Sequence, residues 1–418
     1  MNDEEKVLLG LKQHQDFHVV EELARVFHQN GFELSLVGGC VRDFLLGVGP
    51  EDLDLVSNAK PEEILQFYPD ALQVGRKFGI LKLKHPLLQG RTMEVATYRE
   101  EDSYFDGRHP ERVLWSNRQK DALRRDFTVN AMSFDLKSEK IFDFVGARSD
   151  LKARLLRAIG SPEKRFLEDH LRILRALRFA VHFGFQIETK TLHGLRATKD
   201  KVRSLSPERI TEEVKKSLKI KSLKIVQAYQ EMDLWRILIP SLNGVDSRRW
   251  PFEFKWNDFF VMLLGQLEVD AFDQEKHESN FGDLFPCFVF TKEEKRRIYS
   301  YLSFRREFSS ANFSPSKVFL NFIKNKFELS WEIFEFDLDL QVQAHVHKFK
   351  SYLKSSGWSR DHFPMALLNG SDLVNEGFSG PEIQNLLDEA LLLQIEKKVR
   401  SKKDLQMLML ARKQKRQI

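Results

Sequence analysis

This chain of 418 residues has little cysteine, no long apolar run and no N-terminal segment that resembles a leader peptide. Its two cysteines, Cys40 and Cys287, exclude a disulfide framework and a cysteine-rich zinc site. No apolar run approaches the roughly 20 residues that a membrane-spanning helix needs. The acidic N-terminus lacks the basic-then-apolar order of a signal peptide. We therefore expect a cytoplasmic protein that does not enter a membrane.

What is present indicates a large globular protein. A chain of this length is too long for one compact core, and it predicts two to four domains. Hydrophobic residues make up 42% of the chain and charged residues 30%. The net charge of +5 permits a nucleic-acid partner without demonstrating one.

A glycine turn near the N-terminus predicts a phosphate site. Gly38 and Gly39 interrupt an apolar segment that begins at Leu36. A glycine pair between a strand and a helix lets the backbone approach a phosphate, which its N–H groups can then bind. Arg42 could contact the same phosphate with its forked donors, or it could pair with Asp43 at the start of the helix. The sequence is compatible with both interpretations.

Two aspartates follow this turn. Asp52 and Asp54 alternate with leucines, so a strand over residues 52–56 would turn both carboxylates to one face. Adjacent carboxylates repel each other, and such a pair suits a cation. In a two-metal site the cations activate an attacking hydroxyl and neutralise a leaving pyrophosphate. Glu94 is either a third carboxylate on a neighbouring strand or an ordinary exposed strand position.

A second polar cluster, RRDFTVN, spans residues 124–130. Its Arg124, Asp126 and Asn130 could contact ribose and phosphate, because they combine charge with hydrogen-bonding groups. A string of this kind taken alone is more often a solvated helix face.

A third cluster, EDHLRILR, spans residues 168–175. Asp169 and Arg172 are three residues apart, so on a helix they could hold each other's orientation. A fixed carboxylate beside a fixed guanidinium can hydrogen-bond the edge of a base. The common alternative is a surface salt bridge.

Periodicity and turn signals predict an α+β N-terminal part followed by helices. Helices are expected over residues 17–30, 42–46 and 118–132 and from Pro61. Strands are expected over residues 32–37, 53–56, 72–74, 79–84 and 91–97 and in short pieces over 133–145. The polar residues 99–110 predict a mobile loop. After residue 150 the strand signals fade.

In this order, the clusters resemble one known family. The segments GGCVRDFLLG…DLD, RRDFTVNA, DFVGARSDL, EDHLRILRALRFA and SPERITEE are similar to the successive motifs of class II tRNA nucleotidyltransferases and bacterial poly(A) polymerases. The match covers residues 17–240 and returns over residues 367–387. The resemblance implies an α+β nucleotidyltransferase head with a small mixed sheet (1–150), followed by an all-α neck (151–230), body (231–330) and tail (331–418).

The resemblance also assigns roles. It implies that Asp52 and Asp54 bind two magnesium ions, while body and tail grip the acceptor arm of tRNA. The remaining assignments are phosphate binding by Gly38, Gly39 and Arg42, ribose contacts and local structure for Arg124, Asp126 and Asn130, base reading by Asp169 and Arg172, and nucleotide binding by Arg175. The flexible loop of the family would correspond to residues 99–110.

The resemblance favours addition of CCA to the 3′ end of tRNA from CTP and ATP, with release of pyrophosphate and no nucleic-acid template. The loop is present, whereas members that add only CC generally lack it. Gly75-Arg76-Lys77-Phe78 begins like a poly(A) polymerase signature, but Gly79–Leu83 continues like the CCA-adding enzymes. Addition of A alone, poly(A) synthesis and a catalytically silent RNA-binding relative are the alternatives, and the oligomeric state is not predicted.

Overall fold

A computed structural model of the chain forms two compact units, Met1–Gly244 with Leu284–Phe288, and Val245–Asp283 with Val289–Ile418. The residues expected to form head and neck therefore fall in the same unit, and the boundaries at 150, 230 and 330 stay predictions. The structure describes residues 1–74, 78–104, 110–240, 242, 245, 247–248, 250–254, 256–264, 285–324, 339–358, 364–399 and 401–416.

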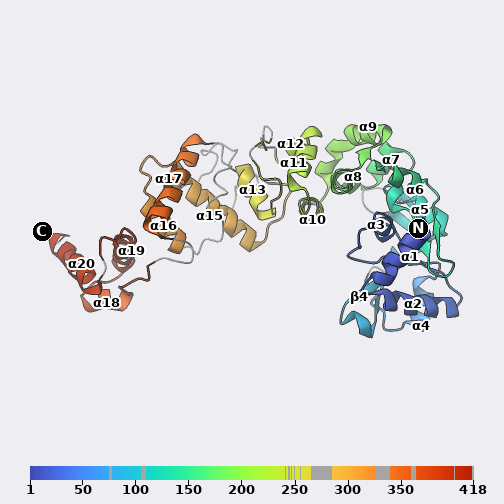
Figure 1. The fold of residues 1–418 in the computed structure, drawn as a ribbon, viewed down its shortest axis with the longest axis horizontal. Helices are drawn as coiled ribbons and strands as arrows, with labels where there is room; N and C mark the ends of the chain where they lie inside the picture. The colour runs from blue at the N-terminus through green and yellow to red at the C-terminus, as the bar shows by residue number, and fades with distance from the viewer. Residues whose placement is uncertain are drawn as a thin grey trace. The chain divides into compact units, whose positions relative to one another are not determined.

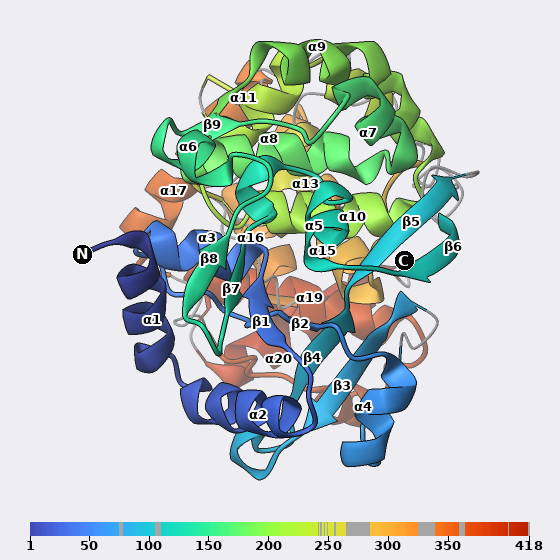
Figure 2. The same cartoon turned by 90° about the vertical axis from the view of Figure 1, so that its right-hand side faces the viewer.

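A mixed sheet lies in the N-terminal part of the first unit (Figures 1 and 2), as predicted, and it has six strands. The strand order is β3-β4-β2-β1-β7-β8. Strand β2 runs parallel to β4 and antiparallel to β1, and the other pairs are antiparallel. The strands are β1 (Leu34–Val37), β2 (Leu55–Ser57), β3 (Ile80–Lys84), β4 (Thr92–Thr97), β7 (Ser133–Asp135) and β8 (Lys140–Phe142).

Burial explains why these residues form strands. All four residues of β1 are buried, as expected for a central strand covered on both faces. In β4 the apolar Met93 and Val95 are buried, whereas Glu94 between them is exposed. This alternation aims Glu94 away from the core, on the face opposite to its two neighbours.

Helices surround the sheet and continue beyond it. Helix α2 buries Val19, Val20, Leu23 and Phe27, which confirms the predicted amphipathic helix. The head contains α1 (Asp3–Gln13), α2 (Phe17–Gln29), α3 (Gly39–Leu45), α4 (Pro61–Phe67), the 3-10 helix η2 (Pro86–Leu88), α5 (Arg118–Leu123), the 3-10 helix η3 (Thr128–Asn130) and α6 (Ala147–Lys152).

The rest of the first unit is helical apart from one short strand pair. Its helices are α7 (Pro162–Glu168), α8 (Leu171–Phe183), α9 (Thr189–Thr198), the 3-10 helix η4 (Lys199–Ser204), α10 (Pro207–Ser217), α11 (Ser222–Glu231) and α12 (Leu234–Leu238). Strands β9 (Leu155–Leu156) and β10 (Gln186–Ile187) pair in parallel beside α8.

Three local predictions were wrong and one helix was missed. Within the expected mobile loop, residues 99–110, Arg99–Tyr104 form strand β5, which pairs with β6 (Pro110–Trp115). Residues 105–109 lie outside the described residues. A two-stranded ribbon can be solvated, so its strands need no apolar alternation. Residues 72–74 contribute only an isolated bridge from Leu72. Helix α1 was not predicted.

The third wrong prediction concerns the helix expected over residues 118–132. Helix α5 ends at Leu123, and Phe127 is extended and fully buried. An extended backbone at Phe127 lets its ring reach the core and lets Thr128 donate to the carbonyl of Arg157 at 2.9 Å. Packing of one large side chain thus overrides helix propensity here.

In the second unit, the described residues form helices and no strands. Aromatic side chains fill much of its interior; Phe259, Phe260, Phe308 and Phe319 are buried. None of the helices that the structure describes is both long and apolar enough to cross a membrane. The helices are α13 (Trp256–Leu264), α15 (Lys292–Ser309), α16 (Pro315–Lys324), α17 (Leu340–Ser356), α18 (Gly370–Asn375), α19 (Glu382–Ile395) and α20 (Lys402–Arg416).

Candidate active site

The glycine turn links β1 to α3 and leaves no room for a side chain. Gly38 has φ +80° and ψ −129°, a conformation that only glycine adopts without strain. Its N–H donates to the carbonyl of Met132 at 3.0 Å, so this N–H is not available to a phosphate. A Cβ atom on Gly38 would lie 2.9 Å from Nη1 of Arg125. The turn therefore brings backbone and a guanidinium into close approach.

Asp52 and Asp54 lie just before β2, not within it. The strand begins at Leu55, which pairs with Leu36 of β1 and Val95 of β4. The carbonyl of Asp54 accepts a hydrogen bond from Val37 at 3.0 Å, which fixes this residue at the end of β1 beside the glycine turn. The predicted strand over 52–56 was therefore wrong at its start, although Asp54 adjoins the turn as expected.

Leu55 of β2 pairs with Val95 of the parallel strand β4. Asp54 directly precedes Leu55 and Glu94 directly precedes Val95, so Glu94 lies near Asp54. Asp54 is exposed to solvent, but the protein around it partly desolvates its carboxylate. This desolvation is the largest cause of the raised pKa of Asp54. The charge of Arg125 opposes this rise, and the charges of Glu94 and Asp52 add to it. Glu94 also binds Lys82 of β3 at 2.8 Å. The structure thus brings the three predicted carboxylates into one electrostatic neighbourhood.

The sequence reasoning missed Arg125 as a site residue. Asp121 is buried and binds both Arg124 and Arg125, with nitrogen–oxygen distances of 2.8 and 3.0 Å. Burial favours the neutral Asp121, but the two guanidinium groups outweigh it and lower its pKa. Held in this way, Arg125 lies over Gly38 and acts on Asp54. The i,i+4 spacing of Asp121 and Arg125 on a predicted helix was the signal that could have indicated this residue.

Four predicted site residues form one continuous hydrogen-bonded chain. Arg42 donates to Oδ1 of Asn130, and Nδ2 of Asn130 donates to Asp126 at 3.1 Å. Arg175 of α8 donates twice to Oδ2 of Asp126, at 2.9 and 2.7 Å. Burial alone would raise the pKa of Asp126, but the charge and hydrogen bonds of Arg175 lower it to about 2. These contacts join α3 through η3 to α8.

Arg42 is buried in this arrangement. It pairs with Asp43 at 2.7 Å, which confirms the ion pair at the start of the helix. Its guanidinium also lies over the ring of Phe183, 4.2 Å from the ring centre. Burial is the main cause of a lowered pKa for Arg42. Phosphate binding by Arg42 stays a prediction, because its contacts here are internal to the protein.

Asp169 and Arg172 do not orient each other. Asp169 follows the end of α7 with an extended backbone (φ −145°, ψ 104°), and α8 begins only at Leu171. Arg172 donates instead to Glu168 at 2.6 Å, and Asp169 binds Arg209 of α10 at 2.9 Å. The expected pairing of the two side chains on one helix was therefore wrong, although the backbone N–H of Arg172 donates to the carbonyl of Asp169 at 3.1 Å.

Arg172 nevertheless connects the second and third clusters. Its Nη2 donates to the carbonyl of Arg124 at 3.3 Å, and Arg165 donates to the same carbonyl at 3.0 Å. Because Arg124 precedes Arg125, the start of α8 lies beside the segment that carries the guanidinium over the glycine turn. The structure thus brings together the three clusters that are far apart in the sequence.

The donor set suits magnesium. Mg²⁺ is commonly bound by one or two carboxylates together with substrate phosphates, and it does not need an all-protein cage. Asp52 and Asp54 supply two such carboxylates, and their mutual repulsion is relieved by a cation. In the part of the chain that the structure describes, no three His, Cys, Asp or Glu side chains are close enough together to hold a metal ion alone.

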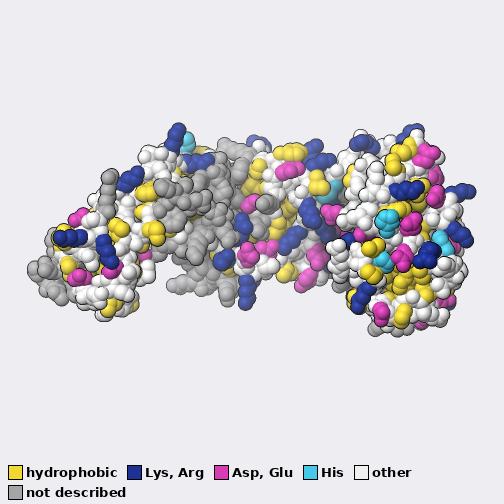
Figure 3. Space-filling model, turned by 60° about the horizontal axis from the view of Figure 1, so that its bottom comes forward, with side chains coloured by type: hydrophobic (Ala, Val, Ile, Leu, Met, Phe, Trp, Pro, Cys, Tyr) yellow, Lys and Arg dark blue, Asp and Glu magenta, His cyan; other side chains and the backbone are white. Residues whose placement is uncertain are grey.

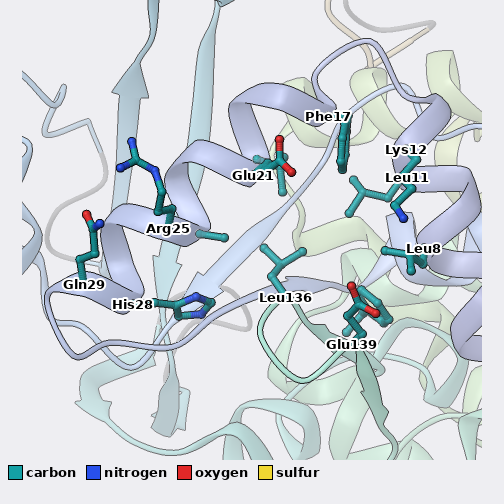
Figure 4. A pocket seen from close by; sticks show the side chains of 13 residues that line it. Leu8, Leu11, Lys12, Phe17, Glu21, Arg25, His28, Gln29, Leu136 and Glu139 are labelled. Atoms are coloured by element: carbon teal, nitrogen blue, oxygen red, sulfur yellow. The ribbon is translucent and has the colours of Figure 1, made fainter.

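One surface pocket lies apart from these residues. It has a volume of about 620 Å³ and is lined by α1, α2, β7 and the residues that follow β7, including Leu11, Phe17, His28 and Leu136 (Figure 4). No predicted site residue lines this pocket, so it does not form part of the candidate site. On the face drawn in Figure 3, basic and acidic side chains are interspersed over the first unit.

Comparisons with known proteins identify the family of this chain. Residues 34–157 match the family described as "Poly A polymerase head domain", and residues 184–245 match "Probable RNA and SrmB- binding site of polymerase A". The chain is 35% identical over 292 residues to a CCA-adding enzyme of Staphylococcus saprophyticus, covering 68% of each chain.

Two further comparisons concern length and fold. A CCA-adding enzyme of Staphylococcus epidermidis is 33% identical over 52% of this chain and 54% of its own, and the match spans about half the length of several such relatives. The structure of a Bacillus stearothermophilus CCA-adding enzyme in complex with CTP aligns over 97% of this chain and 99% of its own, with a TM-score of 0.71 and 22% identity. The chain therefore belongs to the class II family of tRNA nucleotidyltransferases and bacterial poly(A) polymerases.

Proposed function

We propose that this chain adds CCA to the 3′ end of tRNA from CTP and ATP, without a nucleic-acid template, and releases pyrophosphate. One observation carries the proposal: Asp54 adjoins the glycine turn, while Arg172 of the base-reading motif binds the segment that holds Arg125. Metal, phosphate and base contacts are thereby available in one place. The CCA-adding enzymes among its relatives support the same product.

The phosphates would bind beside the glycine turn, within reach of Arg125. The guanidinium of Arg125 is oriented by Asp121 and supplies a positive charge beside Gly38. Asp52 and Asp54 would hold Mg²⁺, with Glu94 as a neighbouring carboxylate. Magnesium bound there would lower the pKa of the RNA 3′ hydroxyl and neutralise the leaving pyrophosphate.

The base would be read at the start of α8. Asp169 accepts from exocyclic amines, and a guanidinium donates to ring nitrogens and carbonyls, so the pair can distinguish C and A from U and G. Nη1 of Arg209 is buried beside Asp169 and has no hydrogen-bond partner among the residues that the structure describes. A bound nucleotide is one group that could accept from it.

The RNA partner is assigned to the acceptor arm and 3′ end of tRNA, held by the helical segments after the neck. Residues 397–418 contain nine Lys or Arg and one acid, and such groups make phosphate contacts. The cytoplasm, where tRNA is matured, is the compartment that fits this activity. Arg124, Asp126, Asn130 and Arg175 would act by supporting the site from inside.

The proposal is tested with three tRNA transcripts that end before CCA, after C and after CC. Each is incubated with CTP, ATP or both, and the products are sized on a gel. Completion of CCA on all three transcripts is expected. Addition of A only to the last transcript, or a long A tail, would identify one of the other family products instead.

The same assay applied to Asp52→Ala and Asp54→Ala tests the assigned chemistry. Each variant should lose about 1000-fold or more in incorporation rate, because one carboxylate of the cation site is gone, while binding of tRNA in a gel-shift assay stays close to that of the parent chain. Full turnover by either variant would refute the assignment, and no incorporation by the parent chain would favour a silent RNA-binding protein.

A further inference from the structure

His14 connects the junction of α1 and α2 to the turn that precedes the two aspartates. The backbone N–H of Asp16 donates to Nδ1 of His14 at 3.1 Å, so Nδ1 is the acceptor and Nε2 carries the proton. Nε2 lies 3.2 Å from the carbonyl oxygen of Pro50 and donates to it. Pro50 is two residues before Asp52 in the sequence.

The other end of this connection is an ion pair. Asp16 is buried and accepts two hydrogen bonds from Arg91, at 3.0 and 2.6 Å. Arg91 directly precedes β4, the strand that carries Glu94. Its pKa is raised, first by the hydrogen bond to Asp16 and also by the charge of Asp52, so Arg91 lies within electrostatic reach of that carboxylate.

The turn before Asp52 needs an external support. Gly47, Val48 and Gly49 are exposed, and Gly47 has φ +73°. Glycine-rich backbone has large conformational freedom, so its position is defined by what anchors it. Pro50, at the end of this segment, is buried, and its carbonyl is the group that His14 binds.

We propose that His14, Asp16 and Arg91 form a brace that fixes Asp52 relative to Glu94 and thereby tunes divalent-cation binding at the site. The three are positioning residues: they act through the carbonyl of Pro50 and through the start of β4. The inference rests on the proposed function, since it assigns the cation to Asp52 and Asp54. Groups that orient metal ligands from outside commonly change metal affinity by 10- to 100-fold when removed.

The test measures Mn²⁺ binding to the full chain without substrate, by the loss of the electron paramagnetic resonance signal of free Mn²⁺. His14→Ala should bind Mn²⁺ about 10-fold more weakly than the parent chain. His14→Gln should recover most of this loss, because its amide can donate to Pro50 from the position of Nε2. The control is His18→Ala, since His18 is exposed on α2 and contacts Glu21.

The variant Arg91→Gln distinguishes a positioning effect of Arg91 from a purely electrostatic effect of its charge. Removal of a positive charge near Asp52 would by itself tighten Mn²⁺ binding, because less repulsion opposes the cation. Loss of the brace predicts the opposite, a weaker affinity by about 3- to 10-fold. Arg91 has a half-exposed side chain, so this variant is expected to fold even if His14→Ala does not.

The metal dependence of nucleotide incorporation provides a second measurement. The Mg²⁺ concentration for half-maximal rate should rise in His14→Ala and Arg91→Gln, with the KM for tRNA unchanged. Parent-like Mn²⁺ affinity in both variants, or tighter binding in Arg91→Gln, would overturn the brace. Failure of the parent chain to incorporate nucleotides would instead overturn the proposed function, so the two failures are distinguishable.

Discussion

Asp169 accepts two hydrogen bonds from Nη2 of Arg209, at 2.9 and 3.1 Å, although these residues are 40 positions apart. The carboxylate assigned to base reading is thus oriented by α10, from the SPERITEE segment, and not by its neighbour Arg172. Because a carboxylate must be fixed to discriminate donors from acceptors, selectivity is expected to depend on α10 as well as on α8.

The first prediction therefore concerns nucleotide choice. Asp169→Ala should reduce the preference for CTP and ATP over UTP and GTP by about 10- to 100-fold, since a two-point contact to a base edge is lost. Arg209→Gln should act in the same direction, but less strongly. Competing incorporation of the four nucleotides measures both. Glu212→Gln, an exposed change on the same helix, should leave the preference intact; unchanged selectivity in Asp169→Ala would leave Asp169 as a salt-bridge partner only.

A second prediction follows from the glycine turn. Gly38→Ala places a methyl group 2.9 Å from Nη1 of Arg125 in a backbone conformation that suits only glycine. We expect a loss of about 1–3 kcal/mol in the free energy of unfolding and a fall in kcat/KM for nucleotide as Arg125 is displaced. Urea unfolding and single-nucleotide kinetics check the two effects. Gly49→Ala is the matched control, because its Cβ would meet open space.

Arg125 gives a third prediction, on pH. The pKa of Asp54 is already raised by burial, and the charge of Arg125 is what opposes that rise. Arg125→Ala should therefore raise this pKa further, so the acidic limb of the rate profile moves toward neutral pH, in addition to a rate loss of about 100-fold. Arg125→Lys should keep the limb near its original place. Lys120→Ala, an exposed change on α5, serves as the control; a limb that stays fixed in Arg125→Ala would contradict the assignment.

A fourth prediction concerns stability and Asp126. Its pKa falls from an unfolded value near 3.8 to about 2 in the folded protein. A lowered pKa stabilises the fold fully above pH 4 and loses this contribution, about 2 kcal/mol, as the pH falls through 2. The stability advantage of the parent chain over Asp126→Asn should thus shrink by about 1 kcal/mol between pH 6 and pH 3. Urea unfolding at both pH values checks this, with exposed Glu139→Gln as control.

Local signals predicted the parts of the site that depend on neighbouring residues. The glycine turn, the short strand before it and the helix after it follow from turn chemistry and apolar spacing. The alternation of Asp52 and Asp54 with leucines identified the acids but wrongly placed them inside the strand. The prediction that the side chains of Asp169 and Arg172 orient each other failed because α7 ends at Glu168 and Asp169 is extended. Helix ends are set by capping and tertiary contacts, which spacing alone does not reveal.

Long-range partners could not be read from the sequence. Arg42 donates a hydrogen bond to Asn130, which is 88 positions away in the sequence, and Arg175 donates one to Asp126, which is 49 positions away. Each of these residues has several plausible hydrogen-bonding or charged partners, and only the packing of α8 against α3 and η3 selects among them. The family resemblance named most of these residues, but it did not indicate that they bind one another.

The buried series of hydrogen bonds from Arg42 to Arg175 determines whether the catalytic head can fold without the neck. A chain cut after Arg157, where the head-domain match ends, would lack α8 and the guanidinium that neutralises Asp126. Removing one partner of a buried ion pair costs about 3–5 kcal/mol, since the other charge is left uncompensated. The sheet and the first helices of the neck are therefore expected to fold as one cooperative unit, so that loss of α8 disables the catalytic head without touching Asp52 or Asp54.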